Sequence, residues 1–213
     1  VYFTSRQVIL IGPMPKTAGN GLREELEASL KKTIKGEVRF DKLSRALYST
    51  DASNYEIEPV GVVIPRTEED VSIAVETARS RGAAILPRGG GTSLAGQAVG
   101  HALVIDFSKY LNDVIEINTE SKTARVQPGI YIEQLNRRLK PSGLMFGPDP
   151  STVRIATAGG VVGNNATGAH SILYGMAGDN VEAAKILLNG STIELGALGE
   201  DALRARAKEG GPA

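Results

Sequence analysis

Residues 87–97 read Pro-Arg-Gly-Gly-Gly-Thr-Ser-Leu-Ala-Gly-Gln, and this stretch says more about the fold than any other part of the chain. It follows the apolar run Ala83–Leu86, which predicts a strand that leads into the three glycines. Glycines reach positive φ and can turn successive N–H groups to one side, which suits a phosphate. Thr92 and Ser93 add hydroxyl donors, and Arg88 adds a cation. The stretch therefore predicts a phosphate-binding loop at a strand end.

A second glycine- and asparagine-rich stretch, Thr-Ala-Gly-Gly-Val-Val-Gly-Asn-Asn-Ala-Thr-Gly, occupies residues 157–168. Two such loops indicate a long ligand with a diphosphate, held from two sides. Three alternatives stay open at this point. The first stretch could be a flexible loop without a ligand, the second could be a glycine-rich helix start packed against a strand, and Arg88 could pair with an acidic core residue.

Composition excludes several function classes. The 213 residues hold 24 Lys and Arg against 24 Asp and Glu, so charge gives no reason to expect nucleic acid or an anionic membrane as partner. The absence of Cys excludes disulfides, thiolate catalysis and iron–sulfur ligands within this chain. The early apolar run Val8–Ile11 is too short for a signal sequence or a membrane span. We expect a cytoplasmic protein.

Common nucleotide and metal motifs do not fit. Gly91 and Gly96 have the spacing of a P-loop, but Gln97 stands where the phosphate-binding Lys is required. The dinucleotide fingerprint fails because Leu94 takes the place of its third glycine. His101 has no partner visible in the sequence, so we expect no metal.

Hydrophobic periodicity and turn residues predict an α+β chain in two lobes, with one glycine-rich loop in each. We divide it into an N-terminal arm and helix (1–40), a first lobe (41–110) and a second lobe (111–213). The predicted helices are Leu22–Ile34, Lys42–Tyr48, one that opens with the capping box at Thr67, Tyr131–Leu139 and the tail after Leu195; the predicted strands are Val60–Ile64, Ala83–Leu86 and Leu103–Ile105, with hairpins over 114–127 and 181–195.

Residues 45–196 resemble the FAD-binding domain of the PCMH-type, or vanillyl-alcohol-oxidase, flavoproteins. The nearest-looking branch is the group of glycolate oxidase subunits and D-lactate and D-2-hydroxyglutarate dehydrogenases. The resemblance implies a two-lobed α+β FAD-binding type-2 domain, truncated at its C-terminal end. It is carried by landmarks in order: Pro65-Arg66-Thr67, the 87–97 stretch, Val126-Gln127-Pro128-Gly129, Gly147-Pro148-Asp149-Pro150-Ser151, the 157–168 stretch, Tyr174-Gly175 and Asp179-Asn180-Val181.

The resemblance also implies which residues hold the cofactor. The FAD diphosphate would lie on the first loop, and the ribityl chain and flavin along the second. Many relatives carry a flavin-linking His in the first loop, where this chain has Thr92, so the resemblance implies non-covalent FAD. The implied binding residues are Arg88, Gly89, Gly90, Gly91, Thr92, Ser93 and Gln97 on one side, and Pro148, Asp149, Thr157, Gly159, Gly160, Asn164 and Asn165 on the other.

The implied activity is that of an FAD-linked oxidoreductase that oxidises the CH–OH group of a 2-hydroxy acid. Electrons would pass to an acceptor other than NAD: a quinone, a cytochrome, an electron-transfer flavoprotein or an iron–sulfur domain. Catalytic residues stay unassigned, and we interpret His170 as a hydrogen-bonded spacer. Alternatives are a non-catalytic flavin-binding subunit and an enzyme like the UDP-N-acetylenolpyruvoylglucosamine reductases. We expect these 213 residues alone to fold, but to bind FAD weakly or not at all and to be inactive. We also expect them to associate with copies of themselves through apolar surface.

Overall fold

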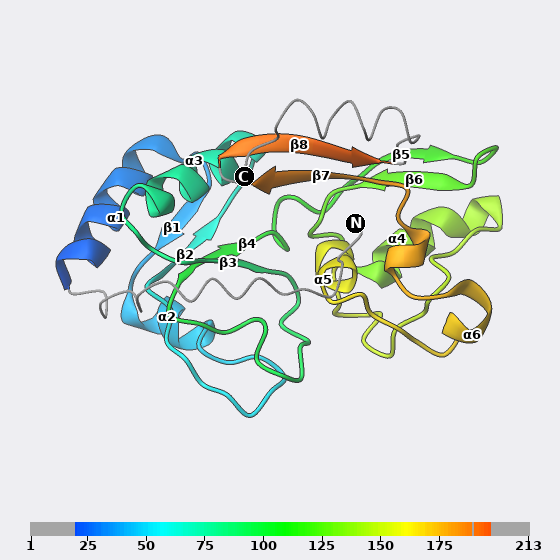
Figure 1. Ribbon diagram of the computed structural model, residues 1–213, viewed down its shortest axis with the longest axis horizontal. Helices are drawn as coiled ribbons and strands as arrows, with labels where there is room; N and C mark the ends of the chain where they lie inside the picture. Colours follow the sequence, from blue (N-terminus) through cyan, green and yellow to red (C-terminus); the bar gives the residue numbers. More distant parts are fainter. Residues whose placement is uncertain (1–19, 189, 197–213) are drawn as a thin grey trace, which may run out of the picture.

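The computed structural model describes residues 20–188 and 190–196 of the chain (Figure 1). Its first half is built on a four-stranded sheet in the order β1-β2-β4-β3, in which β1 is antiparallel to β2 and the other neighbours are parallel. The strands are β1 (Glu37–Arg39), β2 (Gly61–Ile64), β3 (Ile85–Arg88) and β4 (Leu103–Asp106). The two central strands, β2 and β4, are buried along their whole length, as their unbroken apolar sequences require.

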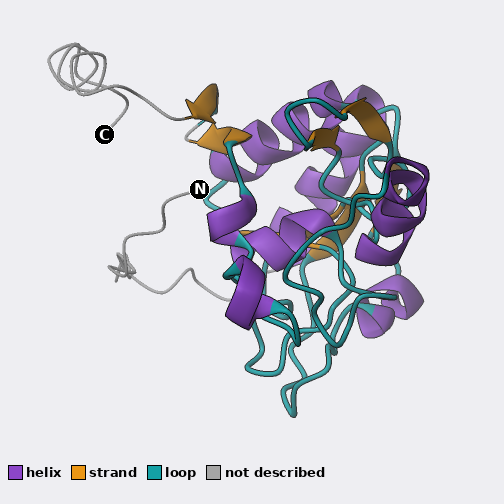
Figure 2. Ribbon diagram, turned by 90° about the vertical axis from the view of Figure 1, so that its right-hand side faces the viewer, coloured by secondary structure: helices purple, strands orange, loops and turns teal. Residues whose placement is uncertain are grey.

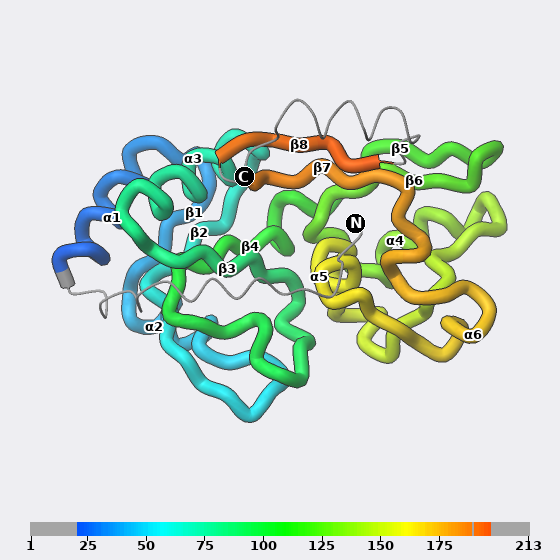
Figure 3. Tube along the Cα trace, in the orientation of Figure 1, coloured from blue at the N-terminus to red at the C-terminus, as the bar shows by residue number. Residues whose placement is uncertain are grey.

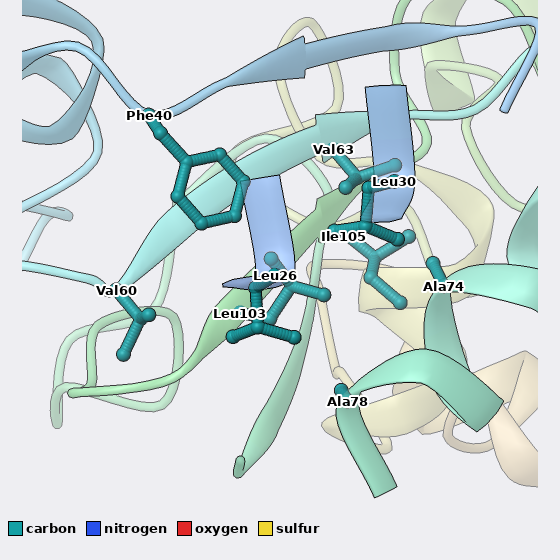
Figure 4. Packing of buried hydrophobic residues seen from close by; sticks show 9 residues of the cluster. All are labelled: Leu26, Leu30, Phe40, Val60, Val63, Ala74, Ala78, Leu103 and Ile105. Carbon is teal, nitrogen blue, oxygen red and sulfur yellow. The ribbon is translucent and has the colours of Figure 1, made fainter. Parts of the chain in front are cut away.

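Helices α1 (Asn20–Thr33) and α3 (Glu68–Arg79) cover one face of this sheet, and α2 (Lys42–Leu47) packs against β2. Leu26 and Leu30 of α1 meet Ala74 and Ala78 of α3 above Ile105, all fully or almost fully buried (Figure 4). The small alanines of α3 let the two helices and the sheet approach one another. The opposite face buries a separate set, Val62, Ile64 and Val104, with Tyr48 and Leu86 packed against it.

Helix α3 begins where the sequence predicts it. The Thr67 hydroxyl accepts a hydrogen bond from the Asp70 amide at 3.1 Å, so the predicted cap is confirmed. The Asp70 carboxylate accepts from amides other than that of Thr67, so two other bonds take the place of the reciprocal bond of the predicted capping box. It is 1% exposed and accepts from the amides of Arg66 (2.8 Å) and Lys35 (2.9 Å), which ties the end of α1 to the start of α3.

The second half has two hairpins and several short helices. The hairpin β5 (Val114–Asn118) with β6 (Thr123–Val126) packs on α4 (Ile132–Leu139), and the hairpin β7 (Ala183–Leu188) with β8 (Ser191–Gly196) runs back toward α3, where Lys185 pairs with Glu68 at 2.5 Å. Between them lie α5 (Ala158–Gly163) and α6 (Ser171–Tyr174), and the 3₁₀ turns Lys140–Ser142 and Gly178–Asn180. Figure 2 shows the loops gathered at one end of the molecule, below the helices.

Strand β1 is absent from the sequence-based expectation, and it changes how residues 20–40 are grouped. Helix α1 and β1 pack into the core of the first sheet, so we place them with the first lobe instead of with an arm. The predicted arm and the predicted helical tail fall outside the described residues, apart from Asn20, the first residue of α1, and Gly196, the last residue of β8. Across the described ranges no helix is long and apolar enough to cross a bilayer.

Candidate functional site

The two glycine-rich stretches meet and enclose one pocket. Its open space is about 370 Å³, part of it shared with solvent. Of the predicted binding residues, nine line it: Gly89, Gly90, Gly91, Thr92, Ser93, Gln97, Thr157, Gly160 and Asn164. Pro87 and Ala98, which sequence reasoning missed, complete the lining. Among the described residues, every side chain that lines the pocket is uncharged.

The three glycines of the first stretch are needed for two different reasons. The sequence predicts positive φ for the run, but among the three only Gly91 adopts it, at 64°. A Cβ on Gly89 would lie 2.0 Å from the Thr157 hydroxyl oxygen, and one on Gly90 would lie 2.0 Å from the Ile155 carbonyl oxygen. Close approach of the two stretches, and not backbone strain, therefore requires glycine at positions 89 and 90.

The main chain of the first stretch offers unused donors. Within the described residues, none of the N–H groups from Gly89 to Ser93 donates to a protein acceptor. Just after this run, the Ala95 amide donates to the Gln97 side-chain oxygen at 3.1 Å. A run of free amides beside two hydroxyls, in a lining without carboxylates, suits an anionic group such as a diphosphate.

The second stretch contains a helix and not an open loop, which is the alternative left open above. Thr157, 1% exposed, caps α5 by accepting from the Gly160 amide at 3.3 Å. Gly159 packs on Pro128: its amide donates to the Pro128 carbonyl at 2.8 Å, and a Cβ would lie 2.9 Å from that ring. Asn164 ends α5, and its side-chain amide donates to the Gly160 carbonyl at 2.9 Å.

Arg88 lies outside the pocket lining. Its guanidinium donates to the backbone carbonyls of Ala98 (2.8 Å), Thr50 (2.8 Å) and Tyr48 (3.3 Å). Among the described residues Arg88 forms no ion pair with a core carboxylate, so the alternative pairing is not found. Its contact with a phosphate stays a prediction. Binding to main-chain carbonyls could not be foreseen, because the segment that supplies two of them is about 40 residues away in sequence.

Four other predicted residues lie away from the pocket lining: Pro148, Asp149, Gly159 and Asn165. Asp149 has φ 51°, and its carbonyl accepts from the Ala169 amide at 3.3 Å. Asn165 has φ 45°, and its side chain accepts from the Gly178 amide at 2.8 Å. These residues shape the bends around the second stretch, and their contact with a cofactor stays a prediction.

His170 lies next to a carboxylate, and its interpretation as a hydrogen-bonded spacer stays a prediction. Its Nδ1 lies 3.2 Å from the Asp149 carboxylate, which links the residues after the second stretch to the Pro148–Pro150 bend. Gly168 contacts the same bend closely, because a Cβ on it would lie 1.9 Å from the Asp149 carbonyl oxygen. His101 lies elsewhere, with Nδ1 3.2 Å from the Glu58 carbonyl oxygen.

Titration behaviour near the pocket follows from the same contacts. Burial raises the pKa of Asp51, but hydrogen bonds from the Ser53 and Ala98 amides and the charge of Arg88 outweigh this and leave the pKa lowered. Burial, followed by the hydrogen bond to Asp106, raises the pKa of Tyr48. Both effects keep Asp51 charged and Tyr48 neutral beside the first stretch.

Comparison with known proteins identifies the family. The FAD binding domain family matches residues 59–196, a range that includes both glycine-rich stretches. The chain is 39% identical over 161 residues to a D-2-hydroxyglutarate dehydrogenase of Escherichia coli, covering 74% of this chain and 16% of that protein. It is 34% identical to the glycolate oxidase subunit GlcD of Bacillus subtilis, covering 76% of this chain and 36% of the relative.

Solved structures agree on the fold. An alkyldihydroxyacetonephosphate synthase superposes with a TM-score of 0.72 at 24% identity, over 93% of this chain and 39% of that one. A variant of Physcomitrella patens BBE-like 1 gives 0.71 at 25% identity, over 84% and 39%. The resemblance stated from the sequence is thereby confirmed, as is the α+β FAD-binding fold. The chain belongs to the FAD-binding domain family, and its cofactor is FAD.

Proposed function

We propose that this chain is the FAD-binding part of an oxidoreductase that oxidises a 2-hydroxy acid. The proposal that the chain binds FAD rests on the run of amides from Gly89 to Ser93, which have no acceptor among the described residues. This run lies in a pocket that Thr157 and Gly160 also line. Support for the substrate half comes from relatives named as D-2-hydroxyglutarate dehydrogenase, glycolate oxidase subunit and D-lactate dehydrogenase. The chain spans 16% of the length of the first of these relatives.

The residues of the pocket divide the work of holding the diphosphate. The amides of Gly89–Ser93 are free to donate to phosphate oxygens, and the hydroxyls of Thr92 and Ser93 extend the donor set. Gln97 and Asn164 add neutral amide groups at the rim. Since no cation from the described part of the chain lines the pocket, recognition there would rest on hydrogen-bond donors fixed in place by the main chain.

Bound FAD supplies the redox chemistry by taking up a hydride equivalent, and the protein supplies position and electrostatics. Thr92 stands where covalently flavinylated relatives have His, so we propose that the cofactor is held without a covalent bond. We further propose an electron acceptor other than NAD, of the quinone, cytochrome, flavoprotein or iron–sulfur kind. No residue of the described part is assigned to proton transfer.

The proposal that the chain binds FAD is tested by titrating the whole apo-protein that carries this domain with FAD and following flavin fluorescence. ADP, which carries a diphosphate, is expected to compete with FAD, and riboflavin, which lacks one, is expected to compete far less. The variant Gly90→Val is expected to weaken FAD binding at least tenfold, because its Cβ would enter the space of the Ile155 carbonyl and move the loop. Unchanged affinity in a folded Gly90→Val variant would contradict the assignment.

A matched control comes from the second stretch. Gly163 is the last residue of α5, and a Cβ there would meet no atom within 4 Å. Gly163→Ala is therefore expected to keep the affinity of the parent chain. If both variants lose affinity equally, the loss reports general destabilisation and the loop assignment fails.

The proposal that the substrate is a 2-hydroxy acid has to be tested on the whole FAD-loaded protein that carries this domain. Glycolate, D-lactate and D-2-hydroxyglutarate are added without an electron acceptor, and bleaching of the flavin absorbance is followed. At least one of them is expected to bleach the flavin. If none does while dithionite does, the cofactor proposal stands and the 2-hydroxy-acid proposal falls.

A further inference from the structure

The first glycine-rich stretch is closed at its base by one arginine. Arg88 precedes the three glycines, and Ala98 follows the end of the 87–97 stretch. One Arg88 nitrogen, Nη1, donates to the Ala98 carbonyl at 2.8 Å, so the side chain joins the two ends of the loop. The other, Nη2, donates to the Thr50 carbonyl at 2.8 Å, and so joins the loop to the segment that follows α2.

That segment, residues 48–53, follows the loop closely. Figure 3 shows it, in cyan, running beside the green chain that follows β3. The Ala52 amide donates to the Gly91 carbonyl at 3.0 Å, and the Ala98 amide donates to the Asp51 carboxylate at 3.2 Å. Arg88 lies in the middle of these contacts.

Gly91 fits the same arrangement. A Cβ on Gly91 would lie 2.7 Å from Nη2 of Arg88, so the absence of a side chain leaves room for the guanidinium. The far side of the guanidinium faces the Tyr48 ring, 5.3 Å from its centroid. The Tyr48 hydroxyl donates to the Asp106 carboxylate at 2.5 Å, which connects the arrangement to the end of β4.

We propose that Arg88 is a positioning residue for the phosphate-binding loop: it holds the loop closed through main-chain carbonyls and does not itself bind the cofactor phosphates. The proposal rests on the proposed function for the meaning of the loop. It explains why a cation next to the glycines is absent from the pocket lining. A planar guanidinium can bind three carbonyls in fixed directions, whereas a lysine ammonium is a single point charge on a flexible stem.

The test compares Arg88→Lys, which keeps the charge, with Arg88→Gln, which removes it. Hydrogen–deuterium exchange of residues 89–97 is measured in the ligand-free chain, and FAD affinity by fluorescence. Both variants are expected to speed exchange in the loop and to weaken FAD binding by a similar factor of about ten or more. Arg138→Gln, a change at an exposed arginine of α4, serves as the control and is expected to alter neither.

Two results would overturn the proposal. In the first, Arg88→Lys binds FAD as the parent does, Arg88→Gln does not, and loop exchange is unchanged in both variants. This is the pattern expected of a direct phosphate ligand. The other is parent-like loop exchange in Arg88→Lys. If Arg88→Gln does not fold, Arg88→Lys decides. Because exchange is measured without ligand, a whole parent protein that does not bind FAD would refute the proposed function and leave this test intact.

Discussion

The contact between the two glycine-rich stretches can be tested by placing one methyl group into it. In Gly89→Ala the new Cβ would lie 2.0 Å from the Thr157 hydroxyl oxygen, 3.1 Å from its Cβ and 3.3 Å from its methyl carbon. Thr157 is 1% exposed and caps α5, so it cannot move aside without losing its hydrogen bond to the Gly160 amide. Overpacking of a well-packed site costs about 1–3 kcal/mol, and loss of a cap about 1 kcal/mol. We expect Gly89→Ala to lower the free energy of unfolding by about 2–4 kcal/mol.

A double-mutant cycle separates this clash from any general effect. Thr157→Ala alone is expected to cost about 1 kcal/mol, for the lost cap. In the double variant the hydroxyl and methyl that the new Cβ meets are gone, and only the Cβ at 3.1 Å remains. The combined cost should therefore fall short of the sum by about 1–2 kcal/mol, within the range for residues in contact.

Urea unfolding of the four chains, analysed by linear extrapolation, gives these free energies. Gly163→Ala is the control, since its added methyl meets open space, and it is expected to be neutral or slightly stabilising. Strict additivity of the two changes, or a Gly89→Ala chain as stable as its parent, would show that the two stretches do not touch at this point and would refute the reasoning.

Three further predictions concern other parts of the molecule. Asp70→Asn is expected to cost about 1–3 kcal/mol in unfolding free energy, because the buried carboxylate accepts two main-chain hydrogen bonds; a loss below 0.5 kcal/mol would contradict this. A hydrogen bond from Lys109, which has the larger effect, and one from Tyr110 lower the pKa of Glu37 from 4.5 to about 2. Charged Glu37 should thus stabilise the fold fully above about pH 4.5, and this effect should fade as the pH falls toward 2. The difference in unfolding free energy between the parent chain and Glu37→Gln should therefore narrow over that pH range. A difference that does not change with pH speaks against the interaction. Acid precipitation of the FAD-loaded protein should leave the flavin in the supernatant, as Thr92 implies, and flavin retained by the pellet would disprove non-covalent binding.

The sequence predicted most of the elements because their signals are local. The apolar face of α1, the cap at Thr67 and the turns of both hairpins can all be read within a dozen residues. Strand β1 was missed because three residues, of which only Val38 is apolar, carry too little periodicity, and pairing with β2 decides its conformation.

The sequence predicted many of the residues that line the site, but not the physical reasons for which they are needed there. Nine of the expected residues line the pocket. The reason for glycine at positions 89 and 90 lies in atoms of Ile155 and Thr157, which no local pattern could place there. The role of Arg88 depends in the same way on a segment that comes next to it only in three dimensions.

The order of the strands has a consequence for how the chain folds as it is made. Strand β4 is the last of the first sheet to be synthesised, yet it lies between β2 and β3, which have no direct pairing with each other. Neither β2 nor β3 can gain a parallel neighbour until residues 103–106 have been added. The connection that must close first, residues 89–102, contains the glycine-rich loop. Since forming non-local parallel pairs is slow, closure of this loop is expected to limit the folding rate of the lobe, and a ligand that holds the loop shut would stabilise the sheet along with itself.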